Sequence, residues 1–142
     1  VKKLGDGQQM YVVGKGRTKN PGFAEENQNY ALRLAGKKGD ACVTFLFRSE
    51  DNRKGNQNDF HRWTSKTGFD IESGWHHIAT SYTFGKPESI RGYIDGQSLD
   101  GEWDYGGATT EAWGLRCLLP CGMPRTATKR REVCRISGGI RK

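Results

Sequence analysis

Two adjacent histidines, His76 and His77, are the residues of this sequence that most directly suggest metal or acid–base chemistry. Both follow Trp75 in a run that favours a β-strand, and neighbouring side chains on a strand point to opposite faces. The two imidazoles therefore cannot bind one metal ion from such a strand. No serine or cysteine nucleophile is visibly paired with either histidine, so triad-type hydrolysis has no support. We expect Trp75 to be a packing residue at the edge of the fold.

A pair of carboxylates, Glu102 and Asp104, is spaced so that both side chains lie on one face of a strand. A retaining glycosidase needs a second catalytic carboxylate nearby, but the positions that could continue this pattern are Gly106 and Gly107. The similar pair in residues 70–72 also lacks a continuation. The sequence therefore predicts a protein that is not an enzyme.

Sugar recognition requires an exposed aromatic ring beside groups that hydrogen-bond to hydroxyls. Trp63 follows a polar loop that contains Asn58 and lies two residues after His61, and Trp103 lies two residues before Tyr105. These five residues are the candidate ligand-binding residues. The alternative is that both indoles cover the faces of a β-sandwich and contribute packing only.

A cluster of oxygen-bearing side chains in residues 49–59 is the candidate calcium site. Asp51, Asn52 and Asp59 supply the carboxylate and amide oxygens that calcium prefers, and flexible loops are where it binds them. Their spacing matches no calcium-loop motif, and a solvated polar loop explains them as well. No other cofactor is expected.

Charge and cysteine content divide the chain into two segments. Of its 142 residues, residues 1–111 hold 15 Lys/Arg and 15 Asp/Glu, whereas residues 112–142 hold eight Lys/Arg against Glu132. The net charge of +7 therefore lies in a basic tail. Such a shift is what a reading-frame change near Ala112 would produce, and a native basic tail is the other explanation. Nucleic-acid binding through this tail is disfavoured, because its basic run at 129–131 has no interleaved aromatic residues.

Three of the four cysteines, Cys117, Cys121 and Cys134, also lie in the tail. They resemble a zinc half-site, but all three histidines of the chain lie upstream, so a fourth ligand is missing. We expect no tetrahedral metal site, and we expect these thiols to lie in a structureless segment or to be prone to oxidation.

The first segment shows repeated short strand patterns and no amphipathic helix. Val43, Phe45 and Phe47 belong to a run that is apolar on both faces, which indicates a buried central strand. Asp95 and Gly96 predict a two-residue type I′ hairpin turn, since both positions tolerate positive φ. The expected strands are residues 10–13, 30–34, 42–48, 60–64, 75–84, 90–94 and 102–105.

The stretch GWHHIATSYTFGKPESIRGYIDGQSL, residues 74–99, resembles a segment of laminin G-like and pentraxin-like jelly rolls. Upstream, the order of the segments YVVGKG, YALRL and VTFLFRS is that of the family's early strands. HRWTS, followed by Gly74-Trp75, resembles the family's bacterial multidomain-protein branch. The resemblance covers residues 9–111 and implies an all-β, concanavalin A-like jelly-roll sandwich of two antiparallel sheets. Residues 112–142 do not resemble the family, so the resemblance does not show whether further strands complete the sandwich at its C-terminal end. The expected division is a laminin G-like domain, 1–111, and a basic cysteine-containing tail, 112–142.

The resemblance implies a non-catalytic recognition module that binds a glycan or protein ligand, sometimes through calcium. It also implies a larger extracytoplasmic bacterial protein, whether periplasmic, secreted or on the cell surface. A start at Val1 without an apolar leader is typical of an excised piece, and no apolar run is long enough for membrane insertion. The alternative function is a structural jelly-roll spacer.

Overall fold

The computed structural model describes residues 3–16, 21, 28–49, 60–110 and 133–140. In this part of the chain the fold is all-β, without an α-helix, and only a single 3₁₀ turn, η3, interrupts the strands. The elements are β1 (Gln9–Lys15), β2 (Tyr30–Lys37), β3 (Asp40–Arg48), β4 (Phe60–Asp70), β5 (His76–Thr83), η3 (Pro87–Ser89), β6 (Arg91–Ile94), β7 (Gln97–Leu99), β8 (Gly101–Tyr105) and β9 (Val133–Ile140).

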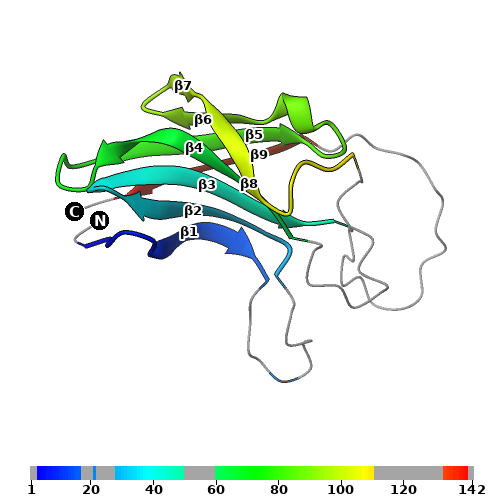
Figure 1. Ribbon diagram of the computed structural model, residues 1–142, viewed down its shortest axis with the longest axis horizontal. Helices are drawn as coiled ribbons and strands as arrows, with labels where there is room; N and C mark the ends of the chain where they lie inside the picture. Colours follow the sequence, from blue (N-terminus) through cyan, green and yellow to red (C-terminus); the bar gives the residue numbers. More distant parts are fainter. Residues whose placement is uncertain (1–2, 17–20, 22–27, 50–59, 111–132, 141–142) are drawn as a thin grey trace.

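The strands form two antiparallel sheets, which confirms the predicted fold class at that level. The five-stranded sheet has the order β1-β2-β3-β4-β8, and the four-stranded sheet has the order β7-β6-β5-β9. Figure 1 shows β8 crossing beside β4, next to the strands of the other sheet. The two sheets pack as a β-sandwich whose core lies between them.

Strand β3 is central and buried on both faces, as its apolar sequence predicted. Val43, Phe45 and Phe47 are almost completely buried, and they pack with Ile78 and Tyr82 of β5. Because side chains alternate along a strand, these three residues face the other sheet, and Thr44 and Leu46 face away from it. The fold therefore has an outer face on the five-stranded sheet that is separate from the core.

The hairpin between β6 and β7 confirms the predicted turn. Asp95 has φ of 49° and Gly96 has φ of 81°, and Ile94 pairs with Gln97 across the turn. Both central residues thus have the positive φ that a two-residue type I′ loop requires.

The C-terminal segment differs from the expectation, because residues 133–140 form strand β9. This strand pairs antiparallel with β5 along its whole length, from His76 opposite Ile140 to Thr83 opposite Val133. Cys134 therefore lies in a strand and not in a structureless tail, whereas Cys117 and Cys121 lie outside the described residues. Two glycines, Gly138 and Gly139, remove side chains from this strand and with them the alternating pattern that would have revealed it.

Candidate functional site

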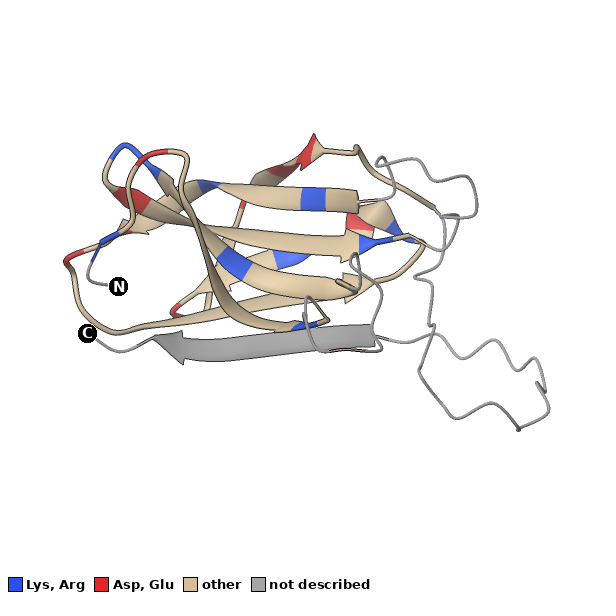
Figure 2. Cartoon of the chain, turned by 90° about the horizontal axis from the view of Figure 1, so that it is seen from below, with Lys and Arg blue, Asp and Glu red and all other residues tan. Residues whose placement is uncertain are grey.

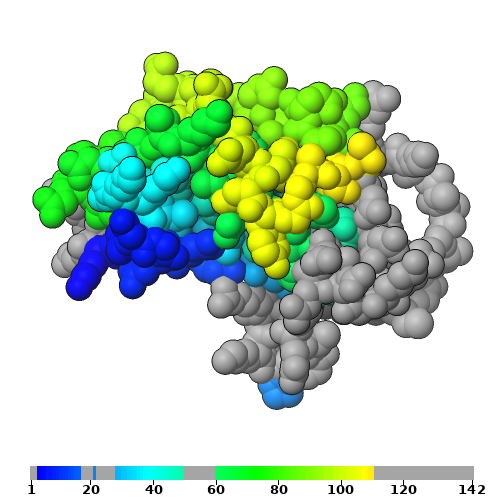
Figure 3. All heavy atoms as spheres, in the orientation of Figure 1, coloured from blue at the N-terminus to red at the C-terminus, as the bar shows by residue number. Residues whose placement is uncertain are grey.

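An open hollow of about 280 Å³ lies on the outer face of the five-stranded sheet. The hollow is called here the outer-face groove, and its lining residues are Tyr11, Gln28, Arg33, Leu46, Phe60, Arg62 and Tyr105. Strand pairing explains how they meet: Tyr11 is opposite Arg33 on β2, and Tyr105 is opposite Arg62 on β4. Figure 3 shows β1, in blue, and the segment holding β8, in yellow, on the same face of the molecule.

Two exposed tyrosines border the groove on strands at opposite edges of the sheet. Tyr11 on β1 retains 38% of its surface accessible and Tyr105 on β8 retains 47%. Leu46 lies between them on the central strand and is nearly buried. The groove thus combines an apolar patch with two aromatic rings that solvent can reach.

An arginine guanidinium lies over the ring of each tyrosine. The guanidinium carbon of Arg62 lies 5.7 Å from the ring centroid of Tyr105, and that of Arg33 lies 5.4 Å from the ring centroid of Tyr11. The hydroxyl of Tyr11 also donates to Oε1 of Gln28 at 2.8 Å. These cation–π contacts and the hydrogen bond restrict the orientation of both rings.

Asp104 fixes the guanidinium of Arg62 from the neighbouring strand. Arg62 donates from Nε to Oδ1 at 2.7 Å and from Nη2 to Oδ2 at 3.0 Å, and the hydroxyl of Thr64 donates to Oδ2 at 3.0 Å. This bidentate geometry is the strong form of an arginine–carboxylate contact. A planar set of hydrogen-bonding groups is therefore held beside the ring of Tyr105.

Of the five predicted ligand-binding residues, the structure places Tyr105 in the groove. Trp63, with 3% of its surface accessible, and His61 point into the core, so the expectation that Trp63 is an exposed stacking residue is wrong. Trp103 packs inward as well, with its ring centroid 5.6 Å from that of Tyr82. Asn58 and the proposed calcium ligands Asp51, Asn52 and Asp59 lie outside the described residues.

The burial of Trp63 has a clear structural cause. Its indole occupies the space left by two glycines: a Cβ on Gly92 would lie 2.6 Å from the ring, and one on Gly101 would lie 2.2 Å from it. Strand β4 alternates His61 and Trp63 inward with Phe60 and Arg62 toward the groove. The polar residues Arg62 and Thr64 on either side of Trp63 could have indicated this direction.

Trp75 also differs from its prediction. It was expected to pack at the edge of the fold, but 56% of its surface is accessible. The residue precedes β5 and follows Gly74, whose φ of 111° turns the chain just before the strand begins. The buried aromatic residue of β5 is instead Tyr82.

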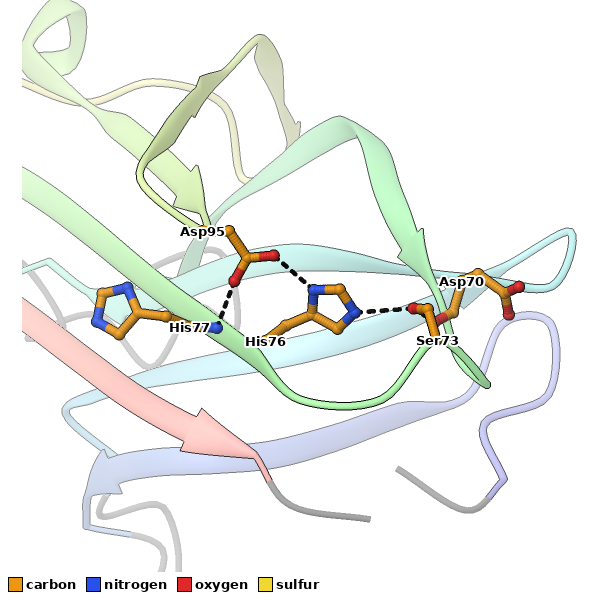
Figure 4. Close-up of polar contacts among 5 residues, drawn as sticks. All are labelled: Asp70, Ser73, His76, His77 and Asp95. Atoms are coloured by element: carbon orange, nitrogen blue, oxygen red, sulfur yellow. Dashed lines mark hydrogen bonds and ion pairs between the residues drawn. The ribbon is translucent and has the colours of Figure 1, made fainter.

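A second cluster joins Ser73, His76 and Asp95 (Figure 4). Nε2 of His76 lies 2.8 Å from the Ser73 hydroxyl, and Nδ1 lies 2.7 Å from Oδ2 of Asp95. The imidazole stacks on Phe69 of β4 with ring centroids 4.2 Å apart. Hydrogen bonds from His76 and from the backbone N–H of His77 lower the pKa of Asp95. The sequence showed no nucleophile paired with a histidine, because the turn after β4 and the β6–β7 hairpin create this contact.

The geometry of this cluster does not match a working triad in one respect. The hydroxyl of Ser73 is also hydrogen-bonded to the backbone carbonyl of Asp70. A carbonyl oxygen can only accept, so the single hydroxyl hydrogen points toward Asp70 and not toward the histidine. A serine nucleophile needs the opposite arrangement, with its hydrogen directed at the base.

Charged side chains of both signs are interspersed over the described residues (Figure 2). No helix in this part of the chain is long and apolar enough to cross a membrane. No protein-family model, curated protein or solved structure matches the chain.

Proposed function

We propose that this chain is a non-catalytic recognition module of the laminin G-like jelly-roll type that binds glycan in the outer-face groove. The observation that carries the proposal is the pair of exposed tyrosine rings, each held by an arginine, on the face of the sheet that the core does not use. The two antiparallel sheets support a sandwich of this kind. A location outside the cytoplasm of a bacterium rests on the sequence resemblance alone.

The chemistry of the groove suits a sugar ring. The apolar C–H face of a pyranose stacks on an aromatic face, and such contacts contribute about 0.5–1.5 kcal/mol beyond the area they bury. The guanidinium of Arg62 and the amide of Gln28 can hydrogen-bond to sugar hydroxyls at the groove. Ring stacking and directional hydrogen bonds are thus available at one place.

A glycan array probed with the full chain and three variants tests the proposal. Tyr105→Ala and Tyr11→Ala should lose most of the bound signal, because each removes a stacking surface from the groove. Trp75→Ala is the matched control, since it removes an aromatic ring that is more accessible than either tyrosine but does not line the groove. This variant should bind as the wild type does.

Two results would contradict the proposal. If the wild-type chain binds no glycan, the module is a structural spacer or it recognises a protein. If glycan binds but Trp75→Ala abolishes binding while the tyrosine variants do not, the ligand lies elsewhere on the sandwich.

A further inference from the structure

His76 lies where two turns and both sheets meet. Its imidazole contacts Ser73 in the turn after β4, Asp95 in the β6–β7 turn and Phe69 of the five-stranded sheet. Figure 4 shows the ring between the serine on one side and the carboxylate on the other. The same carboxylate accepts the backbone N–H of His77 through Oδ1 at 2.8 Å. This arrangement is independent of the outer-face groove.

The positions of the hydrogens follow from counting donors. The ionised carboxylate of Asp95 can only accept, so Nδ1 of His76 must carry a hydrogen. The hydroxyl hydrogen of Ser73 is used on the Asp70 carbonyl, so the serine oxygen must accept from His76. Nε2 therefore carries a hydrogen too. An imidazole with a hydrogen on both nitrogens is the charged form.

We propose that His76 is a proton-dependent clamp, which joins the turn after β4 to the β6–β7 hairpin completely only when the imidazole is charged and Asp95 is ionised. In the neutral ring Nε2 becomes an acceptor. The Ser73 hydroxyl must then choose between Nε2 and the Asp70 carbonyl, so one of the three hydrogen bonds is lost. Histidine is the side-chain type whose charge generally changes between about pH 5 and pH 8, so measurements at these two pH values test the clamp.

The groups that face His76 support a positive charge there. The hairpin contributes the Asp95 carboxylate, and the turn after β4 contributes the Ser73 oxygen. At the end of β4 the ring of Phe69 stacks on the imidazole, and the carboxylate of Asp70 accepts a hydrogen bond from the backbone N–H of Glu72 at 2.9 Å. The neighbouring strand β9 faces His76 at Ile140, a backbone pairing. Asp95 is therefore the one anion in direct contact with the ring among the described residues.

Thermal unfolding of the full chain at pH 5 and at pH 8 tests the clamp. His76→Asn can still hydrogen-bond to Asp95 but cannot gain a proton. The unfolding midpoint of the wild type should therefore lie above that of this variant by a margin that is about 3 °C larger at pH 5 than at pH 8. His77→Asn is the matched control, because its side chain is exposed and lies outside the clamp. Its difference from the wild type should change far less between the two pH values than that of His76→Asn. Ser73→Ala should show a smaller pH-dependent part than the wild type, because the contact of Nε2 is lost while that of Nδ1 with Asp95 remains.

A gap between wild type and His76→Asn that is equal at both pH values, or larger at pH 8, overturns the proposal. If His76→Asn does not fold, nitrogen-edited NMR of the wild type decides the question. Ring N–H signals from both nitrogens of His76 at pH 5, and from Nδ1 alone at pH 8, support the clamp. A single ring N–H signal at pH 5 overturns it.

Discussion

Nδ1 of His76 lies 2.7 Å from Oδ2 of Asp95, although the two residues are 19 positions apart in the sequence. Asp95 is also the first central residue of the β6–β7 turn, where its φ is 49°. One aspartate thus forms the hairpin turn and binds the start of β5. Asparagine would tolerate the same backbone angle but would carry no charge, so the two roles can be separated by substitution.

Asp95→Asn should reduce the sensitivity of the fold to acid. Hydrogen bonds from His76 and His77 lower the pKa of Asp95 below its ordinary value of 3.8. A carboxyl group with a lowered pKa in the folded state contributes stability that is present above pH 4 and is lost as the pH falls further. Urea unfolding at pH 7 and pH 3 should therefore show a smaller loss of stability for Asp95→Asn than for the wild type. Asp100→Asn, an exposed change on the next loop, should lose as much as the wild type.

Trp63→Ala should destabilise the protein much more than Trp75→Ala. Removing a buried tryptophan costs about 3–5 kcal/mol, and Trp63 packs in the core with Tyr82 and Phe45. Trp75 is more than half exposed, so its removal should change the free energy of unfolding by about 0.5 kcal/mol or less. Chemical denaturation of both variants measures the difference. A larger loss for Trp75→Ala would show that the two indoles are placed the other way round.

Gly101→Ala should destabilise the sandwich by overpacking it. The added methyl group would lie 2.2 Å from the indole of Trp63 and 2.6 Å from the carbonyl oxygen of Thr64, so the ring or the strand has to move. Overpacked cores typically lose about 1–3 kcal/mol. The control is Gly5→Ala, whose new methyl group would meet only the flexible side chain of Gln8. Denaturation midpoints should fall for the first variant and hardly change for the second.

Strand positions were predictable from the sequence because alternation and turn residues are local. Val43, Phe45 and Phe47 carry apolar side chains that suit only a buried strand, and Asp95-Gly96 permits few turns other than the one observed. Strand β9 was not predictable in this way, because its pairing with β5 is long-range and two of its residues are glycines.

The candidate site was harder to predict, because it depends on which face of each strand meets the other sheet. Trp63 and Tyr105 are both aromatic residues beside polar ones, and the polar neighbours Arg62 and Thr64 were the one local sign that Trp63 points inward. Tyr11 and Arg33 lie on separate strands, and only the strand pairing brings them together. The Ser73–His76 contact likewise depends on a turn whose geometry the residue types do not specify.

Asp104→Ala should weaken glycan binding while leaving the fold almost as stable as before. Asp104 holds the guanidinium of Arg62 with two hydrogen bonds, and this guanidinium lies over the ring of Tyr105. The side chains of the pair are 24% and 29% accessible, so the ion pair itself contributes at most about 1 kcal/mol to stability. Without the carboxylate the arginine is free to leave the ring, and a ligand must then bear the cost of ordering it. Isothermal titration with a glycan identified on the array should show an affinity several-fold lower.

Glu102→Ala is the matched control, since it removes an exposed carboxylate two residues earlier on the same strand and should bind as the wild type does. If Asp104→Ala binds normally while Tyr105→Ala does not, the ring alone recognises the sugar and the orientation of Arg62 has no part in it.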